Sequence, residues 1–594
     1  MNEFKKYAFI GFLVISGLCG WLYAGETVLV EAEGFDNYGG WKLDQQFMDQ
    51  MGSSYLLAHG LGHPVEDANT EVKFPSVGKY KVWVRTMDWV SPWKKADTPP
   101  AKQAKGTPGV FKVSIDGKEL AATFGNQGDS WHWQDGGFVE IANKVVKIKI
   151  HDLTGFEGRC DAILFSKDSS FVPPNADPVM KKWRRDLLGI ADRATEAGEY
   201  DLVVVGGGTA GICAAVSGAR HGLKVALIQD RGVLGGNNSE EVRVHLGGKS
   251  NFEPYPHLGD IIDSMQTGHH GNRGPAYYYD NAKKIALVKA EKNISLFLNY
   301  RGNEVEMAGG KIKAVIAEDV KTGKRLRFTS RTFADCTGCG VIGFLAGADF
   351  EMTEKSHMGP SNLWRVIDTK KDTTFPKCPW ALDLSSKPFP EGGLGDWFWE
   401  SGFDHDPINK SEYIRDWNFR AMYGAWDALK NVKGKYETHE IEWAAYVAGK
   451  RESRRLLGDI ILTQDDLIKG VKYADGCVPT SWSIDVHLPH RSYVEGFEGD
   501  GFISKDYHTS YDRPYWVPYR CLYSRNIENL FMAGRNISVT HEALGTTRVM
   551  VTTGMMGEIV GMAAAICKEK DVLPRRVYQI YLDELKEMMK KGDK

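Results

Sequence analysis

The chain has 594 residues, a formal net charge of −3, 42% hydrophobic residues and 25% charged residues. These values are typical of a globular protein of about three to four domains, and they exclude a disordered, collagenous or membrane-embedded chain. The near-neutral charge leaves no basic footprint, so we expect no nucleic-acid partner. Nine cysteines are too few for a disulfide scaffold, and the 65 glycines indicate many tight turns.

Residues 1–24 have the pattern of a secretory signal peptide. Lys5 and Lys6 precede an apolar run over residues 7–23, and Ala24 marks the expected cleavage site. The apolar run is shorter than the ~20 residues that a membrane span needs, so we expect no span after cleavage. The pattern predicts a bacterial periplasmic or extracellular protein that is exported through a Sec-type signal.

Residues 25–168 show short alternating strands that are separated by turn signals. Asp116-Gly117 predicts a hairpin turn, and the whole pattern predicts an all-β sandwich. Residues 169–198 follow as a linker with a packing helix. The clearest predicted strands are 27–30, 80–85, 111–115 and 145–150.

Three stretches of this β-region point to a known type of domain: Glu31-Ala32-Glu33, the strand GKYKVWVR and the closing GRCDAILFSKD. They resemble golvesin-like and carbohydrate-binding-module jelly rolls. In such modules, acidic residues near the two ends of the domain often hold calcium, so the resemblance implies Glu31, Glu33 and Asp161 as ligands of a structural calcium ion. Plain surface charge is the alternative. The tryptophans of the region are candidates for sugar stacking or for core packing: Trp41, Trp89, Trp93, Trp131 and Trp133.

From residue 200 the pattern changes to strand, glycine-rich turn and helix, which predicts an α/β, Rossmann-like domain. The strand 200–205 leads into the G-x-G-x-x-G turn of residues 206–211, a helix of small residues and a second strand, 224–228. Such a unit binds a dinucleotide, because the glycines let the backbone approach the pyrophosphate and the helix N-terminus attracts phosphate. The predicted cofactor residues are Gly206, Gly208, Thr209, Ala210 and Gly211, with Gln229, Asp230 and Arg231 at the ribose end.

Three later motifs favour FAD as this dinucleotide. A second glycine-rich turn (232–239) follows the second strand, a Thr-Gly turn ends the strand at 333–338, and an AGR turn (533–535) precedes a long apolar helix. The order of these motifs resembles the glutathione-reductase and fumarate-reductase superfamily. The resemblance adds to the predicted FAD site Gly235, Gly236, Asn237, Asn238, Thr337, Gly338, Gly534, Arg535 and Gly554.

Further strings, over 449–466, 480–490 and 517–535, make the chain similar to the secreted FAD-dependent oxidoreductase family of carbohydrate-degrading bacteria, a distant relative of the heterodisulfide reductase flavoprotein subunit. Cys339 stands where that family usually has aspartate. With Cys336 it is either a redox disulfide or one of two buried small residues. The resemblance implies an FAD-binding domain (199–349 and 526–570), an inserted cap or substrate domain (350–525) and a C-terminal helix (571–594).

The candidate catalytic groups are two histidines and two arginines. His487, expected on a loop, and His541, just before the flavin helix, are the candidate bases, since a neutral histidine accepts an alcohol proton as hydride passes to flavin N5. Arg451, expected on a helical stretch, and Arg548 are candidates to bind a substrate oxygen. His245 is a conceivable point of covalent flavin attachment, with ordinary non-covalent binding as the alternative.

The leading hypothesis is an exported FAD-dependent oxidoreductase that dehydrogenates a carbohydrate hydroxyl and passes the electrons to an unidentified acceptor. One alternative is a reductase of an activated double bond, in which arginine donates the proton or clamps a carboxylate. Another is a glycan-binding protein whose flavin takes no part in catalysis. The carbohydrate substrate rests on the resemblance alone.

Overall fold

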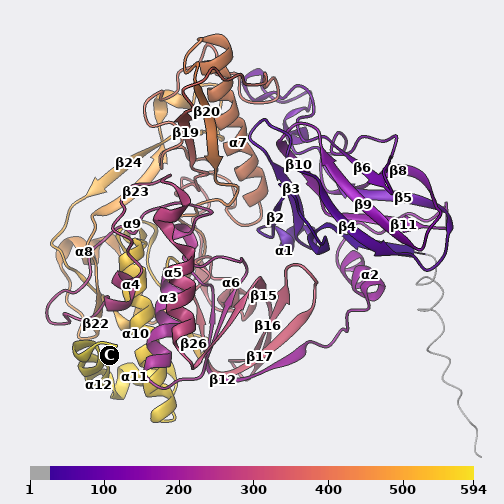
Figure 1. Ribbon diagram of the computed structural model, residues 1–594. Helices are drawn as coiled ribbons and strands as arrows, with labels where there is room; N and C mark the ends of the chain where they lie inside the picture. Colours follow the sequence, from indigo (N-terminus) through magenta and orange to yellow (C-terminus); the bar gives the residue numbers. More distant parts are fainter. Residues whose placement is uncertain (1–26, 594) are drawn as a thin grey trace, which may run out of the picture.

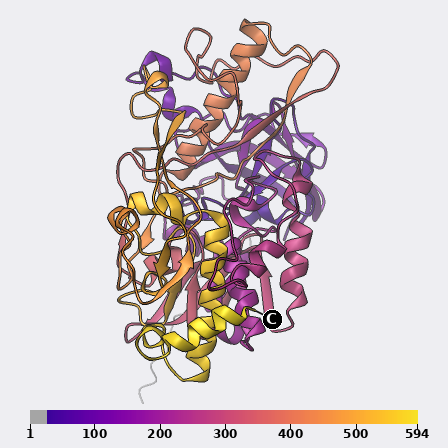
Figure 2. The ribbon, with the colours of Figure 1, turned by 90° about the vertical axis from the view of Figure 1, so that its left-hand side faces the viewer.

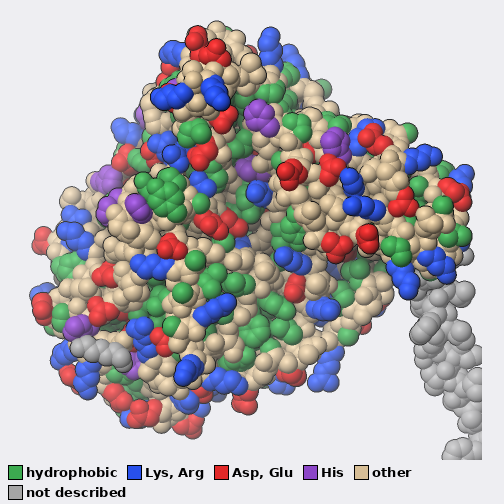
Figure 3. Space-filling model, viewed as in Figure 1, with side chains coloured by type: hydrophobic (Ala, Val, Ile, Leu, Met, Phe, Trp, Pro, Cys, Tyr) green, Lys and Arg blue, Asp and Glu red, His purple; other side chains and the backbone are tan. Residues whose placement is uncertain are grey.

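The computed structural model describes residues 27–593 (Figure 1). The predicted signal peptide lies outside these residues. Figure 1 shows a β-rich N-terminal part beside a larger α/β part. Basic and acidic side chains are interspersed over the face in Figure 3, in keeping with the near-neutral net charge.

The N-terminal part is an antiparallel β-sandwich. Its inward-facing side chains, such as Val82, Val113 and Ile148, are fully buried in one hydrophobic core. One sheet has the order β1 (Thr27–Glu31), β11 (Ala162–Ser166), β5 (Gly78–Thr86), β8 (His132–Ile141). The others are β4 (Ala68–Lys73), β9 (Val145–Asp152), β6 (Phe111–Ile115), β7 (Lys118–Glu119), and β10 (Phe156–Cys160), β3 (Tyr55–His59), β2 (Lys42–Asp44).

The structure confirms the four strands that the sequence predicts most clearly. Each lies within β1, β5, β6 or β9. The hairpin turn is also confirmed, because Asp116 and Gly117 have φ angles of 47° and 79°, the pair of positive values that a tight two-residue hairpin needs. The finer assignment to a jelly roll stays a prediction. The packing helix expected after the sandwich is α2 (Val179–Leu188).

The larger part is built on a seven-stranded mixed sheet. Strand β12 (Thr195–Val205), helix α3 (Thr209–Arg220) and strand β13 (Val225–Gln229) form the parallel unit that the sequence predicts. Helix α10 (Met550–Glu569) packs along α3. The sheet order is β14 (Ile294–Leu298), β13, β12, β17 (Arg325–Asp335), β16 (Lys311–Asp319), β15 (Tyr300–Ala308), with β26 (Leu530–Met532) beside β17.

The cap, residues 350–525, contains one long helix, α7 (Ser411–Asp427), which lies at the top of Figure 1, and four short antiparallel strand pairs. The pairs are β18 (Phe350–Glu351) with β21 (Arg455–Leu456), β19 (Trp364–Asp368) with β20 (His439–Ala444), β22 (Gly476–Pro479) with β25 (Trp516–Pro518), and β23 (Ile484–Pro489) with β24 (Ser504–Thr509). The shorter helices are α1 (Met48–Met51), α4 (Asp260–Ser264), α5 (Asn281–Ala290), α6 (Val341–Leu345), α8 (Gln464–Lys469), α9 (His541–Thr547), α11 (Pro574–Ile580) and α12 (Leu582–Lys591).

Two local predictions in the cap are wrong. Arg451 does not lie on a helix, because residues 450–454 have no regular secondary structure and the backbone beside them bonds to a distant segment: Gly449 N–H donates to Ser361 O at 2.8 Å. His487 does not lie on a loop, because β23 pairs along its whole length with β24. In both places, partners that are far away in the sequence decide the backbone conformation.

Helix α10 is long and apolar enough by composition to cross a membrane, and it is the one such helix among residues 27–593. Almost all of its apolar stretch is buried inside the protein, where it packs against α3. It is therefore a core helix of the flavin-binding part.

The sandwich and the cap share a second hydrophobic core. Trp89 and Phe156 of the sandwich pack against Trp380 with ring centroids 5.3 and 5.0 Å apart, and Phe156 also contacts Tyr423 of α7. In Figures 1 and 2 the sandwich lies against the cap in both views. Core packing thus explains the five tryptophans that the sequence offered for sugar stacking, because all five are buried: Trp41, Trp89, Trp93, Trp131 and Trp133.

Candidate flavin and substrate site

A cavity of about 860 Å³ lies between the flavin motifs and the cap. Eight lysine and arginine side chains and four aspartates line it, so its wall carries a positive excess that suits an anionic occupant. The predicted cofactor residues that line it are Gly206, Gly208, Thr209, Ala210, Gln229, Asp230, Arg231, Gly235, Gly236, Asn237, Thr337, Gly338, Gly534 and Arg535. Gly211, Asn238 and Gly554 do not line it.

The first glycine-rich turn fits a diphosphate. Gly206 has φ 104°, and a Cβ on Gly211 would lie 1.7 Å from Gly206 O, so a larger residue would push α3 away from the turn. A Cβ on Gly208 would meet nothing closer than Gly236 Cα at 3.9 Å, which leaves room for a ligand. Helix α3 begins with neither a side-chain cap nor an acidic residue, so its N-terminal N–H groups can bind phosphate.

The second glycine-rich turn is fixed by hydrogen bonds between side chains and backbone carbonyls. Asn238 O accepts a hydrogen bond from buried Lys284 Nζ at 2.8 Å, and Asn238 Nδ2 donates to Val244 O. Asn237 Nδ2 donates to Lys450 O at 3.0 Å and ties the turn to the cap. The asparagines therefore position the turn through their side chains.

At the ribose end, the structure separates the two candidates. Gln229 Oε1 accepts from Gly207 N–H at 2.7 Å and its Nε2 donates to Val233 O, so both ends of its amide are engaged. Asp230 lines the cavity and pairs with Arg301 at 3.1 Å. Asp230 is therefore the carboxylate that can meet a ribose hydroxyl. Sequence reasoning missed Arg301, because no motif marks it on β15.

The sequence profile described as "FAD dependent oxidoreductase" matches residues 201–393 and 396–589, well over half of the chain. The chain belongs to this family. It is thus an FAD-dependent oxidoreductase, and the cavity with its two glycine-rich turns is the candidate site for the FAD. Helix α10 also begins at this cavity, and its first turn has neither a side-chain cap nor an acidic residue. The partial positive charge at its N-terminus is therefore available to stabilise the electron-rich edge of a flavin.

Curated relatives match this flavoenzyme over short stretches only. A dihydrolipoamide dehydrogenase of Chaetomium thermophilum is 41% identical over 70 residues, 11% of this chain and 12% of that protein. A fumarate reductase (cytochrome) of Shewanella frigidimarina is 42% identical over 72 residues, 10% of this chain and 13% of that protein. The chain therefore spans only about an eighth of the length of these relatives.

Among solved structures, a quinol-fumarate reductase with menaquinol is 11% identical, with a TM-score of 0.30 over 63% of this chain and 72% of that one. A glycerol-3-phosphate dehydrogenase from Bacillus halodurans complexed with FAD is 12% identical, with a TM-score of 0.21 over 32% and 43%.

In the flavoenzyme's cavity, His487 lies between two carboxylates. Its Nδ1 is 2.5 Å from Glu400 Oε1, and its Nε2 is 3.1 Å from Asp485 Oδ1. The ring packs on Trp397 with centroids 5.0 Å apart. Burial alone would raise the pKa of Asp485, but His487 and Arg548 hold it at about 2. His487 is thus oriented by one buried carboxylate and faces a second that stays charged.

Both predicted arginines line the cavity, and both are already engaged. Arg451 pairs with Glu400 at 2.9 Å and donates to Ser361 Oγ at 2.8 Å and to Trp397 O at 2.9 Å. Arg548 pairs with Asp485 at 3.0 Å. Their guanidinium charges are therefore neutralised by protein carboxylates.

His541 is not among the residues that line the cavity. Its Nδ1 lies 2.8 Å from Glu452, which also pairs with Arg455 at 2.6 Å. Burial would raise the pKa of Glu452, but His541 and Arg455 lower it. This position suits a structural contact better than a base, and of the two predicted histidines only His487 lines the cavity.

The eight cysteines among residues 27–593 are free thiols. A Cys336–Cys339 disulfide is therefore not formed. Cys336 is buried, and burial raises the pKa of its thiol. Cys339 lines the cavity, where burial would raise the pKa of the thiol but Lys450 and Arg535 lower it. His245 also lines the cavity, and its Nδ1 lies 2.9 Å from Asn272 Oδ1.

The three predicted calcium ligands do lie together, within 4.8 Å of one another. The positive charge beside them comes from arginine, however. Arg184 of α2 pairs with Glu31 and, at 2.9 Å, with Asp161, which also pairs with Arg85 at 2.8 Å. The calcium prediction therefore finds no support. Helix α2 places the guanidinium of Arg184 beside the carboxylates, a contact that the sequence did not predict.

Proposed function

We propose that this flavoenzyme oxidises a hydroxyl group of a carbohydrate, with His487 as the base. The observation that carries the proposal is the His487–Glu400 pair, at 2.5 Å, in the wall of the cavity. When bound, FAD supplies the acceptor for the hydride that leaves the carbinol carbon.

His487 is suited to take the hydroxyl proton. Glu400 is fully buried and holds the ring through Nδ1, so Nε2 is the nitrogen that remains to accept a proton; it lies 3.1 Å from Asp485 Oδ1 and 3.3 Å from Arg548 Nη2. A proton on Nε2 makes the ring positive, and the carboxylates of Glu400 and Asp485 stabilise that charge. Arg451 also binds Glu400, at the same Oε1 atom that His487 contacts.

The cavity wall offers groups that suit a sugar ring. Trp397 and Trp482 present aromatic faces, and the Trp482 side chain is 39% exposed. Asp485, Asp506 and His508 supply hydrogen-bonding groups on the same side. A carbohydrate has both an apolar ring face and several hydroxyls, so it matches this combination.

The reductase alternative requires a guanidinium that is free to clamp a carboxylate or to donate a proton. Arg451 and Arg548 are both bound to carboxylates of the protein, which argues against that role. The five tryptophans that the sequence offered for sugar stacking in the sandwich are buried, which removes one support of the glycan-binding alternative. We further propose, on the predicted signal peptide, that the enzyme works in the periplasm or outside the cell.

An anaerobic titration of the purified flavoenzyme with a panel of sugars and glycosides tests the proposal. One of them should bleach the oxidised flavin bands. His487→Gln should keep its FAD but slow this bleaching by roughly 10²–10⁴, the usual contribution of a general base. His490→Gln, three residues along the chain and outside the cavity lining, is the matched control and should bleach at the wild-type rate.

Two results would contradict the proposal. One is a flavin that no sugar bleaches but that an enoate reoxidises after chemical reduction, which would favour the reductase. The other is a His487→Gln variant that bleaches at the wild-type rate, which would remove the base.

A further inference from the structure

The N-terminal sandwich contributes to the wall of the flavin cavity, although the family match begins only at residue 201. Gln46, Asp49 and Gln50, which follow β2, line the same cavity as the glycine-rich turns. The sandwich thus reaches the cofactor site through a single short segment, 44–50.

Gln46 binds one side of the cavity wall with its amide. Its Nε2 donates to Tyr446 O at 3.0 Å, and its Oε1 accepts from Ala448 N–H at 3.1 Å. Two residues further on, Lys450 O accepts hydrogen bonds from Asn237 of the second glycine-rich turn and from Arg535. The amide of Gln46 therefore fixes the backbone of residues 446–450, to which Asn237 and Arg535 are hydrogen-bonded.

Asp49 acts on the ribose end. Its carboxylate accepts from Arg301 Nε at 3.0 Å, and Arg301 Nη1 lies 3.1 Å from Asp230. Burial alone would raise the pKa of Asp49, but Arg301 lowers it, so the pair stays charged. Arg301 is thus held between a sandwich carboxylate and the carboxylate that ends β13, where a dinucleotide fold holds the ribose.

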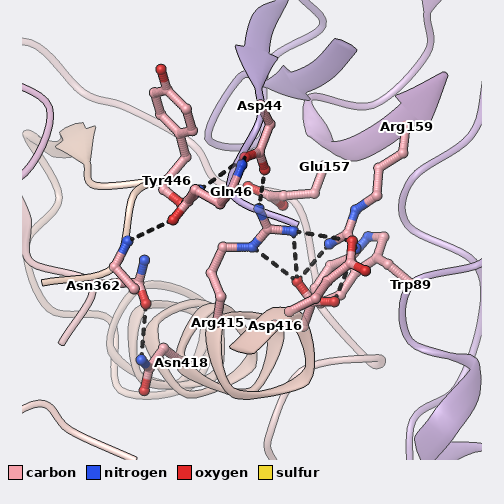
Figure 4. A network of polar contacts seen from close by, with 12 residues as sticks. Asp44, Gln46, Trp89, Glu157, Arg159, Asn362, Arg415, Asp416, Asn418 and Tyr446 are labelled. Atoms are coloured by element: carbon pink, nitrogen blue, oxygen red, sulfur yellow. Dashed lines mark hydrogen bonds and ion pairs between the residues drawn. The ribbon is translucent and has the colours of Figure 1, made fainter. Parts of the chain in front are cut away.

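The segment itself is anchored by the buried polar network in Figure 4. Asp44 accepts hydrogen bonds from Gln46 Nε2 at 3.0 Å and from Tyr55 Oη at 2.8 Å, and it pairs with Arg415 of α7. Asp416, next to Arg415, also binds Arg159 of β10. Because Asp44 and Arg415 are fully buried, the segment has one well-defined position relative to the cap.

We propose that the sandwich is part of the cofactor site, and that Gln46 and Asp49 are positioning residues for FAD, with Asp49 at the ribose end. Gln46 acts through backbone 446–450, and Asp49 acts through Arg301. The Asp49 link ends at Asp230, directly after β13, so it would act on the ribose. The Gln46 link ends at Asn237 of the second glycine-rich turn and at Arg535 after β26, so it would act on the position of these two turns around the cofactor. According to this proposal, the sandwich forms part of the FAD-binding cavity and is not an independent module that is merely linked to the enzyme.

The test measures FAD binding to the full-length apoprotein by quenching of flavin fluorescence, with the visible circular dichroism of the bound flavin as a second readout. Asp49→Asn should raise the Kd on the order of tenfold, a change of about 1.4 kcal/mol, and should alter the circular dichroism. Asp49→Glu, which keeps the charge, should restore most of the affinity. Gln46→Ala should raise the Kd similarly.

Arg301→Gln and the Asp49→Asn/Arg301→Gln double variant complete the cycle. If Asp49 acts through Arg301, the double variant should bind FAD no more weakly than Arg301→Gln alone. Asp135→Asn is the matched control: it removes an ion pair with Lys81 at 2.5 Å on the sandwich, away from the cavity, and should keep the wild-type Kd. The proposal would be overturned if both Asp49→Asn and Gln46→Ala kept the wild-type Kd and spectrum. It would also be overturned if Asp135→Asn lost as much affinity for FAD as Asp49→Asn does.

Discussion

At the scale of single residues, the buried side chain of Lys284 stabilises the second glycine-rich turn. Its ammonium is almost fully buried and donates to Asn238 O and Tyr279 O, both backbone carbonyls. Burial is the main reason that its pKa is lowered to about 8. The second glycine-rich turn therefore depends on an almost fully buried lysine of α5.

Lys284→Met should destabilise the protein, because it leaves those two carbonyls without a donor, at a cost of about 1–3 kcal/mol. The loss should grow with pH. Between about pH 8 and the ~10.4 of an unfolded lysine, the unfolded state binds more protons, so this group adds stability to the wild type as pH rises. The difference between wild type and variant should increase by about 2 kcal/mol from pH 7.5 to 9.5.

Urea unfolding at the two pH values measures this difference. Lys283→Met is the control, since Lys283 is the exposed neighbour on the same helix. A difference between wild type and Lys284→Met that stays constant with pH would contradict the assigned pKa.

At the scale of elements, the flavin-binding part depends on the contact between α3 and α10. Gly557 of α10 faces the start of α3 so closely that a Cβ would lie 2.1 Å from Ala210 O. Since Ala210 also lines the cavity, the same contact sets the position of the helix N-terminus that binds phosphate.

Gly557→Ala should therefore displace α3, which should lower both the stability of the protein and its FAD content. We expect a loss of about 1–3 kcal/mol in the free energy of unfolding and a lower FAD content after purification. Calorimetry and the ratio of flavin to protein absorbance measure them. Gly392→Ala is the control, because a Cβ there meets nothing within 4 Å. Full FAD content in Gly557→Ala would show that α3 tolerates the shift.

At the scale of the whole molecule, the sandwich and the cap are joined by a common interior. They share an aromatic core and the network around Arg415, in which Asp44 comes from the sandwich and Arg415 from α7. An ion pair of this kind is weak evidence for net stability, but removing one partner leaves a buried charge uncompensated.

Arg415→Met should cost about 3–5 kcal/mol, because Asp44 and Asp416 lose their buried cation. We also expect the single unfolding transition to separate into two, one for the sandwich and one for the flavin-binding part. Calorimetry with far-UV circular dichroism tests both points. Lys182→Met, which removes an exposed i,i+4 pair with Asp186 at 3.0 Å, should change stability by less than about 1 kcal/mol. A loss in Arg415→Met no larger than that would refute the coupling.

Features that depend on neighbours along the chain could be predicted from the sequence. The β12–α3–β13 unit, the two glycine-rich turns, the strands of the sandwich and the Asp116-Gly117 turn are of this kind, because glycine φ angles, apolar alternation and short loops act locally. These motifs also sufficed to predict FAD and an oxidoreductase, in agreement with the family match.

By itself, then, the sequence determined the flavin-binding unit, its cofactor and the order of its motifs. Only the tertiary structure decided which histidine meets the cavity, that Arg184 lies among the predicted calcium ligands, and that Gln46 and Asp49 reach the cofactor site. The reason is physical: each of these depends on contacts between residues tens to hundreds of positions apart. Their energies come from burial and charge pairing in the folded chain, which no local pattern records.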